Sequence, residues 1–329
     1  MSSSAPPPPQ SDVTPTEPAR IGSPLRVTSV DGHSPRVCLF GASGFVGRSI
    51  GLHLDQIGVE WIGLSRKGSG ERCRSLNAMS ANEVHELLNQ YPIVINASGS
   101  LKPRDFENDF QGSFNEFWQS LHRFSKLISS CRVTRLIHIS SGGTVYGESG
   151  HERAREEDDE LLPKSWYGRA KVIEEDMLAQ LANRRGIQYV CARVSNPFGN
   201  SDAHNHGFLD VLASSLQQGR TFEARFPERA SRDFIYAPVM AEMITTLALS
   251  DATGVFNVGS GISTRLADVL DHVQKLMPEA KIERMHPDIP ADVVTMALSI
   301  AKYQRHFGNT QTQALLPVQY VEHRLTQRK

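Results

Sequence analysis

The chain has 329 residues and a net charge of −1 at neutral pH, so its composition gives no sign of binding to nucleic acid or to an anionic membrane surface. This length allows one large domain or two interleaved domains around a buried core. No apolar run approaches the roughly 20 residues of a membrane-spanning helix. The four cysteines show neither disulfide nor metal-ligand spacing, which fits a reducing cytoplasm.

Residues 1–34 are rich in serine and proline and include few large apolar side chains. Such a segment cannot bury enough surface to order itself, so we expect a disordered tail without chemistry. It also lacks the basic and apolar regions of a secretory signal. We therefore expect a cytoplasmic protein.

A short apolar run at 36–40 leads into Gly41-Ala42-Ser43-Gly44-Phe45-Val46-Gly47 and then into an amphipathic pattern. This order predicts a buried strand, a tight turn and a helix whose N-terminus holds a pyrophosphate. Gly41 would allow the sharp exit, Gly44 the close approach of the ligand, and Gly47 tight packing of helix on strand. No Lys-Ser or Lys-Thr follows, which argues against a nucleotide-hydrolysing loop. The residues predicted to bind a dinucleotide here are Gly41, Ser43, Gly44, Phe45, Val46 and Gly47.

A second strand is predicted at 59–64 and ends in Ser65-Arg66-Lys67. In a dinucleotide fold this end faces the adenosine ribose, where an acidic side chain would favour NAD. Arg66 and Lys67 stand there instead and could hold a 2′-phosphate, so the cofactor is NAD or NADP with a preference for NADP. A solvated basic turn is the alternative interpretation.

Further strands are predicted at 93–95, 136–139 and 188–193, with a long helix at 109–131 whose aromatic stripe we assign to the core. Ala97, Ser98 and Gly99 follow the first of these strands, and such small residues let a cofactor lie against the backbone. Strands that alternate with helices predict an α/β fold, a doubly wound parallel sheet, with ligands bound outside the carboxyl ends of the strands.

Two segments carry metal-binding side chains without the spacing of a metal site. The acidic residues 152–160 are predicted to form a solvated loop. His204 and His206 make a pair in a predicted loop, and no third ligand is evident. We therefore predict no metal site.

Tyr167 and Lys171 are four residues apart, so on a helix they share one face. A tyrosine phenol ordinarily has a pKa of about 10, and both a nearby ammonium and a positively charged nicotinamide would favour its ionised form. Tyr167 could then act as a base, with Ser141 or Thr144 orienting a substrate hydroxyl. The spacing alone also arises by chance, so its neighbours must give it weight.

Those neighbours resemble the extended, nucleotide-sugar branch of the short-chain dehydrogenase/reductase superfamily, the NAD-dependent epimerase/dehydratase family, and within it most closely the UDP-glucose 4-epimerases. The resemblance covers about residues 36–300, and the motifs occur in family order. Besides the glycine turn they are Ser140-Ser141-Gly142-Gly143-Thr144-Val145-Tyr146-Gly147, Tyr167-Gly168-Arg169-Ala170-Lys171, Arg193-Val194-Ser195-Asn196-Pro197-Phe198-Gly199, Arg232-Asp233-Phe234-Ile235-Tyr236 and Phe256-Asn257-Val258-Gly259-Ser260-Gly261.

The resemblance implies that Tyr167 is the catalytic base, that Lys171 activates it and anchors the ribose, and that Asn196 and Arg232 contact a nucleotide diphosphate. The usual hydroxyl partner is replaced by Gly142, so we prefer Ser141, with Thr144 close behind. Gly143 and Thr144 stand where sugar dehydratases carry an Asp-Glu pair, which argues against dehydration. Two further family positions differ: an Asn is Asp109, and a second diphosphate arginine is Ile289.

Together these features predict a Rossmann domain at 35–195 with 232–258, and a smaller C-terminal substrate-binding lobe at 196–231 with 259–329. The leading function is a nucleotide-sugar epimerase that acts at C4 through a 4-keto intermediate, in polysaccharide or sugar-nucleotide biosynthesis. The alternatives are an NADPH-dependent 4-keto-sugar reductase and, in another class, a non-catalytic dinucleotide-binding redox sensor. A homodimer formed through paired helices is a family expectation.

Overall fold

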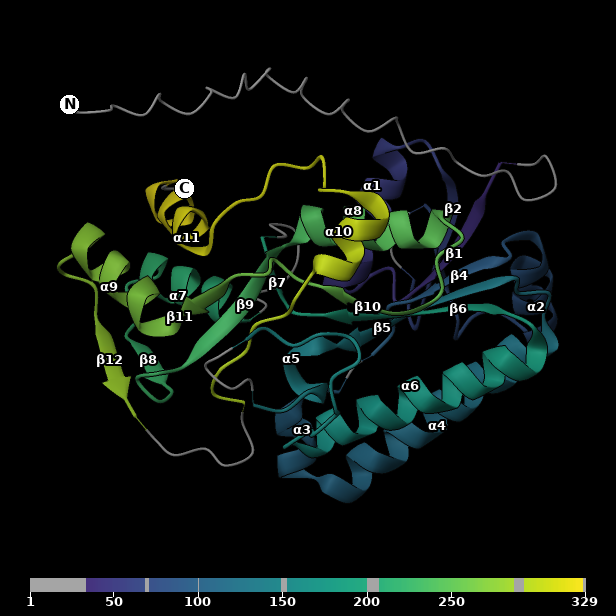
Figure 1. Cartoon of the computed structure of the whole chain (residues 1–329), viewed down its shortest axis with the longest axis horizontal. Coiled ribbons are helices and arrows are strands. Elements are labelled where there is room, and N and C mark those ends of the chain that lie inside the picture. Colours follow the sequence, from purple (N-terminus) through teal and green to yellow (C-terminus); the bar gives the residue numbers. More distant parts are fainter. Residues whose placement is uncertain are drawn as a thin grey trace, which may run out of the picture.

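The structure is a computed structural model that describes residues 34–68, 71–99, 101–148, 153–199, 207–286 and 293–327. Most of the predicted tail, the His204–His206 pair and Ile289 lie outside these residues. The described chain forms a large sheet covered by helices and a smaller unit at one end of that sheet (Figure 1).

Seven parallel strands form the main sheet, in the order β10-β6-β5-β4-β1-β2-β3. Their apolar side chains are buried on both faces, as expected for a parallel sheet between helices. The strand order reverses between β1 and β4, which makes their carboxyl ends the switch point where such folds bind ligands. The predicted doubly wound α/β fold is confirmed. The strands are β1 (Arg36–Phe40), β2 (Glu60–Ser65), β3 (Cys73–Ser75), β4 (Ile93–Asn96), β5 (Arg135–Ser141), β6 (Gln188–Val194) and β10 (Gly254–Val258).

Helices cover both faces of this sheet (Figure 1). On one face, α1 (Phe45–Gln56), α8 (Ala237–Leu249) and α10 (Ala301–Phe307) share one apolar core with the strands. On the other face, α2 (Ala81–Gln90), α3 (Pro103–Asn108), α4 (Phe110–Ser130) and α6 (Trp166–Arg185) share a second core. Two separate cores on one sheet are the mark of a doubly wound domain.

The long helix α4 has the N-terminal cap and the buried apolar stripe that its sequence pattern indicates. Asp109 caps its N-terminus, since the carboxylate accepts a hydrogen bond from the Gly112 amide at 2.9 Å. Phe117, Leu121, Phe124 and Ile128 recur at helical spacing and are buried, as predicted for a core stripe. The core prediction is wrong for Phe110, because its ring is exposed and packs against Trp166 of α6.

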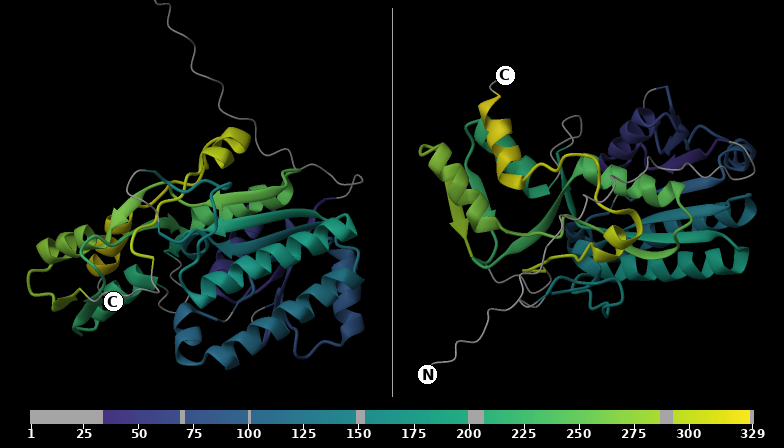
Figure 2. Two further views of the ribbon diagram at one scale, coloured as in Figure 1. Left: turned by 60° about the horizontal axis from the view of Figure 1, so that its bottom comes forward. Right: turned by 45° about the horizontal axis from the view of Figure 1, so that its top comes forward.

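The smaller unit is built from short strands and three helices around its own apolar core. Both turned views place it beside one end of the main sheet (Figure 2). Its three-stranded sheet is β11-β9-β7 and its two-stranded sheet is β12-β8. These elements are β7 (Asn196–Phe198), β8 (Phe222–Arg225), β9 (Ser231–Tyr236), β11 (Ser263–Arg265), β12 (Ile282–Met285), α7 (Gly207–Gln217), α9 (Leu266–Leu276) and α11 (Pro317–Thr326).

Two elements cross the boundaries drawn from the sequence. β9 opens the stretch assigned to the Rossmann domain, yet it pairs with β7 and β11, and only α8 and β10 after it join the main sheet. α10 falls in the predicted lobe, yet its Tyr303 is buried in the core between α8 and the main sheet. The substrate-binding role of the smaller unit stays a prediction.

The acidic loop is less solvated than predicted, within the part that is described. Glu157 is buried, and its carboxylate accepts a hydrogen bond from the Asn257 main-chain N–H at 2.9 Å. Asp159 pairs with Arg153 inside the loop, and Glu157 ties the loop to β10. The described residues contain no group of three or more His, Cys, Asp or Glu side chains that could hold a metal ion.

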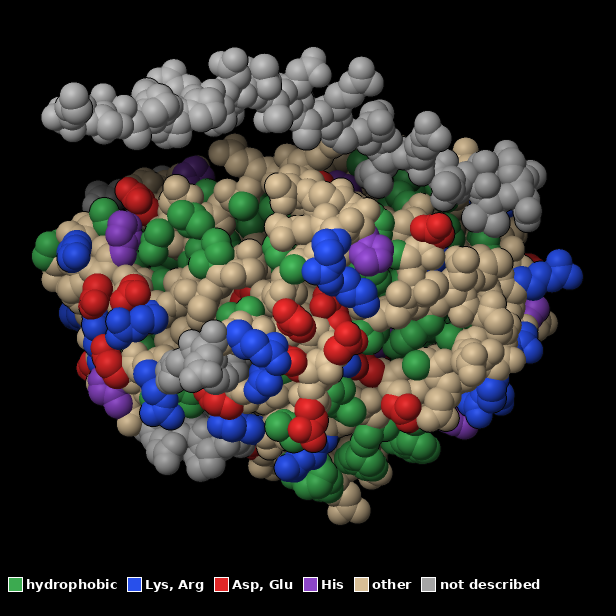
Figure 3. All heavy atoms as spheres, viewed as in Figure 1, with side chains coloured by type: hydrophobic (Ala, Val, Ile, Leu, Met, Phe, Trp, Pro, Cys, Tyr) green, Lys and Arg blue, Asp and Glu red, His purple; other side chains and the backbone are tan. Residues whose placement is uncertain are grey.

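Acidic and basic side chains are interspersed over the surface seen in Figure 3, as the near-zero net charge leads one to expect. Cys38 of β1 and Cys191 of β6 are buried core residues. Every described helix is too short or too polar to cross a membrane.

Candidate active site

A cavity of about 620 Å³ lies where the carboxyl ends of the central strands face the smaller unit. Its lining comes from both parts of the molecule, and it brings together ten residues that the sequence singled out. These are Val46, Ala97, Ser98, Gly99, Ser141, Thr144, Tyr167, Lys171, Asn196 and Arg232. The other predicted site residues, Gly41, Ser43, Gly44, Phe45, Gly47, Ser65, Arg66 and Lys67, lie outside its lining.

The glycine turn between β1 and α1 is packed so closely that side chains are excluded at two positions. Gly41 has φ +77°, and a Cβ there would lie 2.4 Å from the Ala97 carbonyl oxygen. A Cβ on Gly47 would lie 2.2 Å from the Gly41 carbonyl oxygen. The turn thus brings the N-terminus of α1 against the loop after β4, which is the cradle that a dinucleotide pyrophosphate requires.

Arg66 and Lys67 lie exposed at the carboxyl end of β2, directly after the buried Ser65. The Ser65 hydroxyl accepts a hydrogen bond from the Gly68 amide at 3.0 Å and so fixes the turn that presents the two basic side chains. Within the described residues, no acidic side chain forms an ion pair with either one. Their position next to the glycine turn suits an anionic group on the adenosine side of a dinucleotide.

Tyr167 lies in the first turn of α6, at the mouth of the cavity. The helix begins there because the Ser165 hydroxyl caps it, accepting a hydrogen bond from the Gly168 amide at 3.1 Å. The Phe106 ring of α3 packs edge-on against the Tyr167 ring at a centroid distance of 6.5 Å. The cap fixes where α6 begins, and the contact with Phe106 packs the Tyr167 ring at the cavity.

Lys171 lies one turn further along α6 and is nearly buried. Its ammonium donates to the Glu174 carboxylate at 2.8 Å and lies 3.5 Å from the Ile139 carbonyl of β5. Burial alone would lower the pKa of Lys171, but the Glu174 carboxylate outweighs it and raises that pKa above the usual value. Lys171 is therefore a fixed positive charge at neutral pH.

The structure gives a reason for the glycine at position 142, where the resemblance implies a hydroxyl side chain. A Cβ on Gly142 would lie 2.9 Å from the Arg193 carbonyl oxygen and 2.6 Å from Leu298 Cδ1, so this position has no room for a side chain. Ser141 ends β5 and Thr144 lies in the short helix α5 (Gly142–Val145), and both line the cavity with Tyr167. A substrate hydroxyl would therefore find its partner in Ser141 or Thr144.

Asn196 and Arg232 line the side of the cavity formed by the smaller unit. The Asn196 amide donates to the Asp233 carbonyl at 3.0 Å, which ties β7 to β9. The Arg232 guanidinium donates to the Ser231 and Val294 carbonyls at 3.0 and 2.8 Å. These contacts to main-chain carbonyls orient the guanidinium fork.

Three charged residues near the site belong to none of the motifs found in the sequence. Lys102, in the loop before α3, and Arg225 of β8 both line the cavity, and only the folded chain brings them there. Glu174 could have been found, because a carboxylate three residues after a lysine on a helix lies within reach of it.

Comparison with known proteins gives this cavity a context. The sequence model of the NAD dependent epimerase/dehydratase family matches residues 37–259. The dTDP-4-dehydro-6-deoxyglucose reductase of Escherichia coli is 23% identical over 277 residues, and the match covers 78% of this chain and 87% of that protein. The dTDP-6-deoxy-L-talose 4-dehydrogenase of Kitasatospora kifunensis is 26% identical over 272 residues, covering 78% and 82%.

A solved structure shows the same fold. The UDP-glucose 4-epimerase of Thermus thermophilus, in complex with NAD, superposes with a TM-score of 0.76 at 23% sequence identity, covering 89% of this chain and 99% of that chain. The family model spans most of the described main sheet and both β7 and β9. The sequence resemblance is thus confirmed, and the chain belongs to the NAD-dependent epimerase/dehydratase family, whose members are enzymes.

Proposed function

We propose that this chain transfers a hydride at C4 of a nucleotide-activated hexose, with Tyr167 exchanging the proton on the C4 oxygen. The observation that carries the proposal is the meeting of Tyr167 and Lys171 with Asn196 and Arg232 in one cavity. A phenol beside an ammonium suits proton exchange with a sugar hydroxyl or ketone. A guanidinium fork on the opposite wall suits a diphosphate.

The residues around the cavity fit a nicotinamide dinucleotide, which would supply or accept the hydride. The packed glycine turn offers the N-terminus of α1 to a pyrophosphate. Val46 and the small residues Ala97, Ser98 and Gly99 line the cavity on the side of the main sheet, where they would face the nicotinamide half. Lys171 would anchor the adjoining ribose.

The first candidate reaction is reduction of a 4-keto sugar with NADPH. Arg66 and Lys67 favour it, because they suit the 2′-phosphate of a reductant that dissociates after each turnover. The two curated relatives above support it, since both are named for redox chemistry at C4 and match most of this chain. Hydride adds to C4 while Tyr167 gives its phenolic proton to the ketone oxygen, so C=O becomes CH–OH, and water then reprotonates Tyr167.

The second candidate is 4-epimerisation, favoured by the epimerase-like spelling of the motif from Ser140 to Gly147. Tyr167 takes the hydroxyl proton as hydride leaves C4. The 4-keto sugar would then rotate within the site, and hydride would return to the opposite face of C4. No net redox occurs, so the dinucleotide stays bound. Dehydration is not proposed, because Gly143 and Thr144 stand at the positions of the acidic pair that it needs.

One experiment separates these reactions. The purified protein is denatured and any released dinucleotide is identified by mass spectrometry. The native protein is then assayed with dTDP-4-dehydro-6-deoxyglucose plus NADPH, and with UDP-glucose alone. An empty site and consumption of NADPH support the reductase. Stoichiometric NAD and conversion of UDP-glucose to its C4 epimer would support the epimerase instead.

The role of Tyr167 is tested in whichever assay shows turnover. Tyr167→Phe removes the exchangeable proton but keeps the ring that packs on Phe106. We expect turnover to fall by at least about a hundredfold, with the unfolding temperature and dinucleotide affinity close to those of the wild type. Full turnover in this variant would overturn the proposed chemistry.

We also propose that two copies of the chain pair through the outer face of α4 and α6. Phe110, Trp118 and Trp166 keep 42%, 46% and 51% of their surfaces exposed. The Phe110 and Trp166 rings lie 4.8 Å apart, so the aromatic side chains of the two helices adjoin. Exposed aromatic surface of this kind marks an interaction site.

A further inference from the structure

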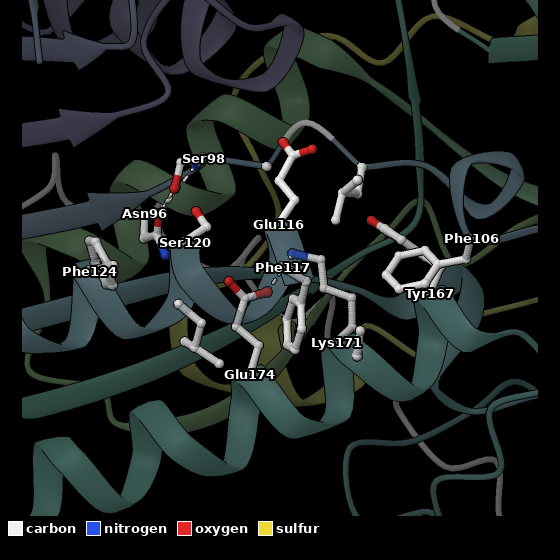
Figure 4. Close-up of a pocket in the computed structure, with 14 residues that line it drawn as sticks. Asn96, Ser98, Phe106, Glu116, Phe117, Ser120, Phe124, Tyr167, Lys171 and Glu174 are labelled. Carbon is white, nitrogen blue, oxygen red and sulfur yellow. Dashed lines mark hydrogen bonds and ion pairs between the residues drawn. The ribbon is translucent and has the colours of Figure 1, made fainter. Parts of the chain in front are cut away.

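A second, smaller pocket of about 100 Å³ lies between α4 and α6, directly behind Tyr167 and Lys171 (Figure 4). It contains titratable side chains that the proposed reaction does not use. Glu174 faces the Lys171 ammonium from the same helix, and Glu116 of α4 lines the opposite wall. His138 of β5 lies behind Glu174.

The contacts around Glu174 form a short polar chain. One carboxylate oxygen accepts from the Lys171 ammonium at 2.8 Å, and the same oxygen lies 3.6 Å from His138 Nε2. The side chains of Lys171 and Glu174 are 13% and 14% exposed, and that of His138 is fully buried. Water therefore has little access to the pair, and their charges act on each other more strongly than they would on a surface.

The protonation states follow from burial and contact. Burial alone would raise the pKa of Glu174, but the Lys171 ammonium outweighs it and holds that pKa below the usual value. Burial lowers the pKa of His138 to about 4, so its imidazole is neutral at pH 7. The pair next to Tyr167 is thus one ammonium and one carboxylate, with no second cation from His138.

We propose that Glu174 is a positioning residue that fixes the Lys171 ammonium and offsets its charge, and so sets the pH range in which Tyr167 exchanges its proton. This inference rests on the proposed role of Tyr167. A lysine has a long, flexible stem, and the contact with Glu174 holds its end against β5 beside the phenol. An ammonium near a phenol favours the ionised phenol, and a carboxylate in contact with that ammonium, as Glu174 is with Lys171, weakens the effect.

The other charged or titratable groups around the pair do not take over this role. Glu175 of α6 is bound by Arg193 at 2.8 Å, so its charge is already matched. The pKa values of Tyr189 and Cys191 are raised well above normal by burial, so both are neutral. Glu116 and Lys102 are exposed, and water screens them.

The test is the charge-neutral variant Glu174→Gln, which keeps an oxygen that can accept from Lys171. The ionisation of Tyr167 is followed by ultraviolet absorbance as the difference between each protein and the same protein carrying Tyr167→Phe. We expect the absorbance titration to move to lower pH in the variant, because no carboxylate then offsets the Lys171 ammonium. The rate of sugar oxidation, where the wild type shows it, should move to lower pH by the same amount.

Asp176→Asn is the matched control, because it removes the same charge from the exposed side of α6. It should leave the titration unchanged. If both variants shift it equally, or if Glu174→Gln does not shift it at all, the inference is wrong. If Glu174→Gln does not fold, Glu174→Asp replaces it, and a titration identical to the wild type would overturn the inference.

The titration needs no substrate, so it separates this inference from the proposed function. A shift in a protein that turns over none of the sugars tested would support the charge coupling and count against the proposed reaction. Normal wild-type turnover without a shift would leave the reaction in place and remove the role of Glu174.

Discussion

Arg66 and Lys67 show how much can depend on single residues at the end of one strand. Both are exposed beside the glycine turn, and no acidic residue stands with them at the end of β2. A carboxylate there would repel a 2′-phosphate and accept hydrogen bonds from a free ribose. A guanidinium attracts the 2′-phosphate and cannot accept those hydrogen bonds. The choice between the two proposed reactions therefore depends in part on these side chains.

Arg66→Ala should weaken NADPH binding by about tenfold or more, because one charge-assisted contact to the 2′-phosphate is lost. NADH affinity should change by less than about threefold, since NADH lacks that phosphate. Isothermal titration calorimetry measures both. Arg132→Ala, an exposed charge in the turn before β5, is the control and should change neither. Equal loss for the two dinucleotides would refute the assignment.

The residues of the candidate active site differ in how far the sequence could identify them. Tyr167 and Lys171 could be identified from the sequence because helical spacing puts both on one face of α6. The preference for Ser141 or Thr144 over Gly142 came from a departure in the motif, and the packing of Gly142 against Arg193 supplies its physical reason. Lys102 and Arg225 could not be identified from the sequence, because only the tertiary structure brings them to the cavity.

At the scale of elements, the glycine turn joins β1, α1 and the loop after β4 through main-chain contacts. Gly41 and Gly47 are needed because backbone atoms occupy the space of their side chains. The turn could be predicted, since the order of strand, glycines and helix has few other structural solutions. The contact of the turn with Ala97 could not be predicted, because it depends on the pairing of β1 with β4.

Gly47→Ala should destabilise the fold by about 2 kcal/mol, since the added methyl group meets the Gly41 carbonyl and the chain must shift. Urea unfolding measures this change. Gly143→Ala is the control, because the nearest atom to its Cβ would be at 3.6 Å, an ordinary contact. It should be neutral or slightly stabilising. Equal stability of the two variants would show that the turn is less tightly packed than described.

The elements that sequence reasoning missed are the short ones. β7, β9 and β11 have three to six residues each, too few to show a clear period. The sequence placed residues 232–258 in the Rossmann domain, yet hydrogen bonds tie β9 to β7 and β11. Partners distant along the chain decide such strands, and local patterns do not report them.

At the scale of the whole molecule, the proposed dimer surface lies on α4 and α6, the helices that also surround the pocket behind Lys171. The sequence assigned the aromatic stripe that includes Phe110 and Phe114 to the core, yet Phe110 is exposed, and so is Trp118, one turn beyond Phe114. Periodicity shows that a face is apolar, but it does not distinguish burial in a core from burial between two copies.

Trp118→Glu should weaken self-association by at least about thirtyfold, because a charge replaces an aromatic anchor at the proposed interface. Light scattering coupled to gel filtration, over a range of concentrations, measures the molar mass. Gln119→Glu adds the same charge at the neighbouring exposed position and should leave the dimer intact. A wild-type protein that stays monomeric at all concentrations would contradict the proposal.

The cavity is lined from positions as distant along the chain as Val46, Ser141 and Arg232. These segments come together only after β1, β4, β5 and β6 have paired and β9 has joined β7 across the end of the sheet. Closing such long loops is slow, so the cavity is completed late in folding, and no isolated segment of the chain contains it. Recovery of turnover after dilution from denaturant therefore reports the last stage of folding, while circular dichroism of the helices reports earlier ones.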